Sequence, residues 1–86
     1  QEAMRWYRKA AQSDFHFAQY ELGAIYSEGR ANQRQDLPEA YYWATLAARH
    51  QFRQAKELAD TLSPQLSHDE RARIDARIKK WKRVVS

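Results

Sequence analysis

Apolar residues recur along this chain three or four positions apart, which is the spacing of one helix face. No segment alternates apolar and polar residues as a half-buried strand would, and residues that favour helices dominate the composition. The pattern predicts an all-α fold with five helices, at residues 1–12, 15–28, 37–49, 52–62 and 68–84.

Three of these helices carry a distinct apolar stripe. In the first helix the stripe is Ala3, Trp6 and Ala10, with Tyr7 and Ala11 beside it. In the second it is Phe15, Ala18, Leu22, Ile25 and Tyr26. In the last it is Ile74, Ile78, Trp81 and Val85, on a helix that is otherwise strongly charged. We interpret this last helix as a cap whose stripe faces the core.

Residues that begin and end helices lie where the stripes stop. Gly29 is expected to end the second helix in a left-handed conformation, and Asp14 to cap its start. Residues 36–39 and 67–70 have the spacing of a capping box, which predicts the starts of the third and fifth helices. The segment between Gly29 and the third helix is polar and is predicted to be a loop.

The chain repeats part of itself after 37 positions, as the pairs of matching residues show. The pairs are Glu2/Glu39, Ala3/Ala40, Trp6/Trp43, Ala10/Ala47, Ala11/Ala48, Phe15/Phe52 and Ala18/Ala55. A period of this length is typical of stacked helical hairpins, each of which buries its apolar face against the next. Gly23, inside a helix, indicates a close helix crossing that has no room for a methyl group.

Two quoted segments, "AQYELGAIYSEG" and "DLPEAYYWATLAA", resemble the Sel1-like repeat, a relative of the tetratricopeptide repeat. The matching positions are Ala18, Leu22, Gly23, Tyr26, Gly29, Asp36, Ala40, Trp43, Ala47 and Ala48. The chain departs from the family pattern at Ala31 and Asn32, where the family has Gly and Val, and its loop is one residue longer. The resemblance implies a right-handed α/α superhelix of antiparallel hairpins.

The resemblance also divides the chain. Residues 1–12 would be the second helix of a truncated repeat, 13–49 one complete repeat, and 50–86 a degenerate last hairpin with a charged capping helix. The expected packing residues between repeats are Ala3, Trp6, Ala10, Ala18, Leu22, Gly23, Tyr26, Ala40, Trp43 and Ala47. We expect an apolar edge at the N-terminus that a preceding repeat would cover.

Residues suited to catalysis or metal binding are sparse. There is no Cys, and His16, His50 and His68 lack metal-ligand spacing; the first two lie at helix junctions, where a solvated or capping histidine is expected. No serine lies in a nucleophile elbow. We therefore expect no enzymatic activity, no cofactor, no metal and no small-molecule substrate. No apolar run approaches the length of a membrane span.

The expected function is a protein-interaction scaffold, as the resemblance implies. Its concave face would present Phe17, Tyr20, Ala24 and Ser27, with the two aromatic residues as anchors. The family assembles complexes in bacterial envelope processes or signalling, or in eukaryotic membrane-protein quality control. Both the bacterial envelope or periplasm and the cytoplasm remain open, and so does the identity of the protein partner.

The charge distribution suggests a less favoured alternative. The net charge of +4 comes entirely from residues 68–86, since residues 1–67 carry eight basic and eight acidic side chains. The basic residues of this segment are Arg71, Arg73, Arg77, Lys79, Lys80, Lys82 and Arg83. They could contact nucleic acid or another anionic surface, although no recognition motif accompanies them.

Overall fold

The structure, a computed structural model, describes residues 2–82 of the chain, and they form five α-helices. The helices are α1 (Glu2–Gln12), α2 (His16–Glu28), α3 (Leu37–Ala48), α4 (Arg53–Leu62) and α5 (His68–Lys80). A short 3-10 helix, η1 (Ser63–Gln65), joins α4 to α5. The predicted all-α fold is confirmed.

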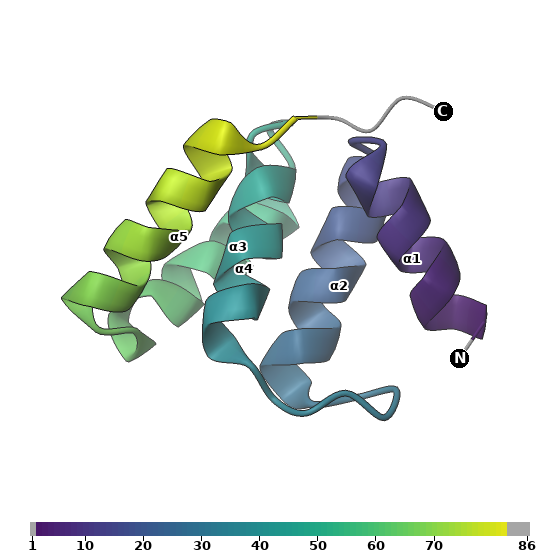
Figure 1. Cartoon of the computed structure of the whole chain (residues 1–86), viewed down its shortest axis with the longest axis horizontal. Coiled ribbons are helices and arrows are strands. Elements are labelled where there is room, and N and C mark those ends of the chain that lie inside the picture. Colours follow the sequence, from purple (N-terminus) through teal and green to yellow (C-terminus); the bar gives the residue numbers. More distant parts are fainter. Residues whose placement is uncertain (1, 83–86) are drawn as a thin grey trace.

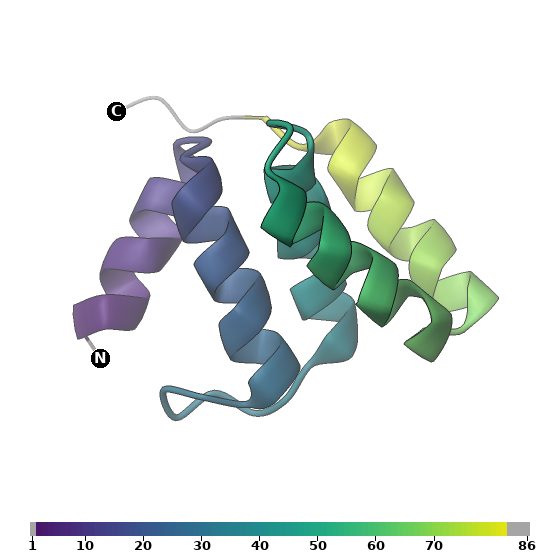
Figure 2. The same cartoon turned by 180° about the vertical axis from the view of Figure 1, so that it is seen from behind.

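The helices lie in two layers (Figures 1 and 2). One layer contains α1, α3 and α5, which are nearer the viewer in Figure 1. The other contains α2 and α4, which are nearer in Figure 2. Each of the hairpins α1–α2 and α3–α4 therefore contributes one helix to each layer. Helix α2 packs against both α1 and α3, and α5 packs against α3.

The core lies between the layers. Its buried residues are Met4, Ala11, Ala18, Leu22, Ile25, Tyr42, Trp43, Leu46 and Ile74. Gly23 lies at the crossing of α2 and α3, where a Cβ atom would stand 3.2 Å from both the Ala40 carbonyl oxygen and the Ala44 backbone nitrogen. This is the close crossing that the sequence predicts, because only a residue without a side chain allows the two backbones to approach so closely.

Several helix ends follow the sequence signals. Gly29 has φ 73° and donates its N–H to the Ile25 carbonyl, which closes α2. Ser67 and Glu70 form a reciprocal capping box at the start of α5. Asp36 accepts a hydrogen bond from the Glu39 backbone at 3.1 Å, but the Glu39 side chain turns elsewhere, so this cap is only half of a box.

The expected cap at Asp14 is wrong. The residue that caps α2 is Phe15, whose side chain makes no capping hydrogen bond. Asp14 has φ 68°, a left-handed conformation, and its carboxylate accepts no hydrogen bond from a backbone N–H of α2. That carboxylate instead accepts hydrogen bonds from the side chains of Gln19 and His50. Phe15 is consequently at the surface rather than on the buried stripe of α2.

The last helix is shorter than predicted. It ends at Lys80, and Trp81 is extended, with φ −65° and ψ 136°. This bend brings the Trp81 ring 6.0 Å from the Arg49 guanidinium, where it packs against the core. Residues 81 and 82 are therefore not helical as predicted, and the Trp81 side chain packs against the core instead. The remaining predicted positions, 83–84 of the helix and Val85 of its stripe, lie outside the described residues.

Helix α1 buries a different face from its predicted stripe. Met4 and Ala11 are buried and Tyr7 packs beside them, whereas Ala3 and Trp6 are exposed and Ala10 is half-buried. The buried face is the one that meets α2. Ala10 packs against the core, whereas Ala3 and Trp6 are exposed within residues 2–82, in keeping with the apolar edge expected from the sequence.

Candidate interaction surfaces

Aromatic side chains gather on the surface where α1 meets α2. Trp6, Phe15 and Phe17 are 54%, 44% and 47% exposed. Their rings form a chain, with centroids 6.2 Å apart between Trp6 and Phe15 and 6.3 Å apart between Phe15 and Phe17. Large apolar residues that are exposed together mark interaction sites more often than single ones do.

This chain of rings is flanked by partly buried aromatic residues. Tyr20 of α2 packs edge-on against Phe52, the cap residue of α4, with centroids 5.2 Å apart. His16 also packs against Phe52, at 5.3 Å. We call Phe15, Phe17, Tyr20 and Phe52 the aromatic surface. It runs from α2 to the residue that precedes α4.

The other two residues predicted for the concave face contribute less. Ala24 is half-buried, and the Ser27 hydroxyl donates to the Ala24 carbonyl at 2.9 Å. The Ser27 carbonyl accepts from the Gln35 side chain, also at 2.9 Å. Ser27 therefore supports the loop that follows α2. Of the four predicted residues, Phe17 and Tyr20 present aromatic surface, and only Phe17 is largely exposed.

Two residues of the aromatic surface were not predicted as site residues. The sequence pattern places Phe15 on a buried stripe and marks Phe52 only as its matching residue in the repeat. The signal that could have found them is their shared position. Both are cap residues immediately before a helix, where a side chain extends beyond the helix's buried face.

A polar cluster joins the turns of the two hairpins. Asp14 Oδ1 lies 2.7 Å from His50 Nε2, and the rings of His50 and His16 stack with centroids 5.3 Å apart. The Gln19 amide donates to Asp14 Oδ1 and to the Ala11 carbonyl. Both histidines lie at helix junctions as expected, and the contact between the turns explains why polar residues occupy them.

The cations of α5 have different roles. Arg77 donates to Glu39 at 3.0 Å and lies 3.8 Å from the centroid of the Tyr42 ring. Arg71 donates to the Ser63 hydroxyl at 3.3 Å. Both therefore fasten α5 to its neighbours. Arg73, Lys79, Lys80 and Lys82 are exposed, and Arg83 lies outside the described residues.

The Arg77 contacts affect two pKa values. Burial raises the pKa of Tyr42, an effect that Arg77 reduces and Glu39 reinforces. For Arg77, burial alone would lower the pKa, but the hydrogen bond to Glu39 and its charge raise it above the ordinary value. Arg77 is thus a permanent cation, and Glu39 is its principal partner.

Metal-binding and membrane-spanning features are absent from the described part of the chain. Residues 2–82 contain no group of three or more metal-ligand side chains placed to hold an ion. None of the helices in that range has the length and apolar content needed to cross a bilayer.

A family model described as "Sel1 repeat" matches residues 1–15 and 16–52. The chain belongs to the Sel1 repeat family. Sel1 repeats form helical solenoids that generally mediate protein–protein interactions and are typically non-catalytic. The second Sel1 match takes in α2, α3 and Phe52, and therefore includes Phe17 and Tyr20. No curated protein and no solved structure matches the chain.

Proposed function

We propose that this Sel1 repeat protein is a non-catalytic scaffold that binds a partner protein through the aromatic surface on the α2–α4 layer. The observation that carries the proposal is the exposure of Phe17 within a chain of contacting rings. Aromatic side chains are enriched among the residues that dominate binding energies, because they bury a large area with few rotatable bonds. A partner would cover Phe17 and extend toward Tyr20.

The arrangement of the hairpins supports this location. Helices α2 and α4 lie side by side in one layer, as Figure 2 shows, and the Tyr20–Phe52 contact joins them. A surface that crosses two hairpins can recognise a longer segment of a partner than a single helix can. Nucleic-acid binding through α5 lacks a comparable observation, because Arg71 and Arg77 are engaged within the fold.

We also propose that α4, η1 and α5 form the degenerate hairpin that the sequence suggests. They follow the second Sel1 match, which ends at Phe52. Ile74 of α5 is buried in the core beside α3 residues, so α5 covers a face of α3 that would otherwise meet solvent.

The test is affinity capture from cells that contain the natural protein, with quantitative mass spectrometry. Phe17→Ala should deplete the captured partner by at least about tenfold, the range of a binding hot spot. Lys80→Ala, at an exposed position of α5, is the matched control and should leave capture unchanged. Circular dichroism verifies that both variants remain folded. Unchanged capture by the Phe17 variant would remove the proposed surface.

A further inference from the structure

A basic hollow lies between α1 and the loop at residues 29–36. Its volume is about 410 Å³. It is lined by Met4, Arg5, Arg8, Lys9, Gln12 and Gln33. Three of the six lining residues are cations and none is acidic. Such a lining favours an anionic occupant over a neutral or cationic one.

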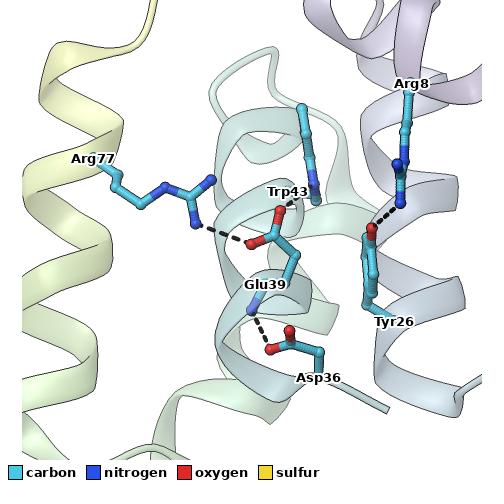
Figure 3. A network of polar contacts seen from close by, with 6 residues as sticks. All are labelled: Arg8, Tyr26, Asp36, Glu39, Trp43 and Arg77. Carbon is cyan, nitrogen blue, oxygen red and sulfur yellow. Dashed lines mark hydrogen bonds and ion pairs between the residues drawn. The ribbon is translucent and has the colours of Figure 1, made fainter. Parts of the chain in front are cut away.

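A second hollow of about 310 Å³ continues from the first, since both are lined by Arg8 and Gln12. It is also lined by Tyr26, Glu39, Trp43 and Arg77, so it extends past α3 to α5 (Figure 3). Glu39 is its only acidic residue, and Arg77 and the Trp43 indole N–H already bind that carboxylate. We call the two hollows together the α1–α3 groove.

The 37-residue repeat explains why this groove is open. Arg5, Arg8 and Lys9 of α1 correspond to Tyr42, Thr45 and Leu46 of α3. On α3, Tyr42 and Leu46 are buried, and Arg77 of α5 lies over the Tyr42 ring. Helix α1 has cations where α3 has core residues, so α1 and α3 do not close on each other as α3 and α5 do.

The cations of the groove keep most of their capacity to bind an anion. Arg8 donates to the Tyr26 hydroxyl at 2.7 Å and to the Gln33 side-chain oxygen at 3.4 Å, and both acceptors are neutral. Arg5 and Lys9 form no ion pair within residues 2–82. The Arg8 guanidinium is thus positioned by the fold without being neutralised, as a carboxylate-binding arginine requires.

We propose that the α1–α3 groove binds an acidic peptide segment of a partner protein. Carboxylates of the segment pair with Arg5, Arg8 and Lys9, while the amide side chains of Gln12 and Gln33 are placed to hydrogen-bond a peptide backbone. Single-stranded nucleic acid fits less well because it is held by stacking on exposed aromatic rings. The one Trp in the lining, Trp43, is buried and its N–H is used by Glu39.

This site is independent of the aromatic surface. On α1, Arg8 lies about 200° around the helix from Trp6 and Arg5 about 100°, whereas Lys9 lies only about 60° away, because successive helical residues are about 100° apart. The groove belongs to the layer of α1, α3 and α5, whereas Phe17 and Tyr20 belong to α2. A partner that covers Phe17 and Tyr20 therefore leaves the Arg8 side of the groove accessible.

The first test measures binding of a fluorescein-labelled deca-glutamate peptide to the 86-residue chain by anisotropy at low salt. Arg5→Gln/Lys9→Gln should weaken binding about tenfold, since two close charge pairs are lost. Arg73→Gln/Lys79→Gln, on exposed positions of α5, removes the same charge and should change the affinity less than about twofold. Equal weakening by the two variants would show attraction by net charge alone and would overturn the proposal.

A second variant separates the shape of the groove from its charge. Gln12→Trp leaves the net charge unchanged and places a large ring between the two hollows. It should weaken peptide binding at least about fivefold, because the peptide and the ring compete for the same volume. Undiminished affinity would contradict the proposed location. Phe17→Ala should bind the peptide normally, so failure of the aromatic surface and failure of the groove give different results.

A third arm tests the nature of the anion. A short DNA duplex replaces the peptide in the same assay, with the same pair of variants. Duplex binding tighter than peptide binding, and lost in Arg5→Gln/Lys9→Gln, would assign the groove to nucleic acid and overturn the peptide proposal. We expect the duplex to bind no better than the peptide, and its binding to be equally sensitive to both variants.

Discussion

Helices α1 and α3 occupy equivalent positions in the repeat but have different surroundings. Trp6 and Trp43 are matching residues, yet Trp6 is 54% exposed and Trp43 is 8% exposed. Helices α4 and α5 both pack against α3, whereas α1 faces α3 across an open groove. The comparison teaches that matching positions of one repeat pattern are buried or exposed according to whether another helix packs over them.

The largest effect should come from truncating the two tryptophans. Trp43→Ala should lower the free energy of unfolding by about 3–5 kcal/mol, the range for removing a large buried aromatic side chain. Trp6→Ala should lower it by less than about 1 kcal/mol, because most of that ring already meets solvent. Urea denaturation followed by circular dichroism measures both. Similar losses would mean that the two helices are not packed as differently as the structure indicates.

A smaller difference should separate the arginines at the two interfaces. Arg77→Gln removes both the Glu39 ion pair and the contact with the Tyr42 ring, and should destabilise the chain by about 1 kcal/mol. Arg8→Gln removes hydrogen bonds to neutral groups only and should cost about 0.5 kcal/mol. Urea denaturation followed by circular dichroism compares the two variants. A larger loss of stability in Arg8→Gln than in Arg77→Gln would contradict the conclusion that α3 and α5 pack more tightly than α1 and α3.

A third prediction concerns the loop that borders the groove. Ala31 has φ 56°, a left-handed conformation that is unfavourable for a residue with a Cβ atom, and Asn32 follows with φ 62°. Ala31→Gly should relieve this strain and stabilise the chain by about 0.5 kcal/mol, after allowing for the greater freedom of Gly when unfolded. Ala76→Gly, on the exposed face of α5, is the control and should destabilise. Destabilisation by both would argue against strain at Ala31.

The smallest effect is a loss of stability at high pH. The pKa of Tyr42 is raised in the folded chain, so its contribution is fully present below the ordinary tyrosine value of about 10 and is lost as the pH rises through the folded pKa. The urea midpoint should therefore fall above about pH 10, and should fall less in Tyr42→Phe. An identical decline in the two chains would exclude Tyr42 as its source.

Local signals in the sequence predicted most of the fold. The left-handed Gly29 and the capping box at residues 67–70 each depend on residues a few positions away. The 37-residue period can be seen directly in the sequence. Gly23 was also informative, because a helix tolerates Gly best where another backbone lies close. Family membership likewise followed from residues within the repeat.

Tertiary contacts decided what the sequence could not. Asp is a common cap residue, but the Asp14 carboxylate contacts His50 of the α3–α4 hairpin and does not cap α2. The stripe of α5 continues to Trp81, yet packing of that ring beside Arg49 ends the helix at Lys80. The α1–α3 groove was not predicted either, because Arg5, Arg8 and Lys9 are ordinary surface residues until the open space beside them is known.

The Asp14–His50 contact has a mechanical consequence. It joins the turn of the first hairpin to the turn of the second, so the two hairpins are tied at one end of their long axes. The loop at residues 29–36 joins the same two hairpins at their other end, and α2 and α3 pack closely between these two connections. The two hairpins are therefore fastened at both ends and along the α2–α3 crossing, so any relative motion between them requires that crossing to open.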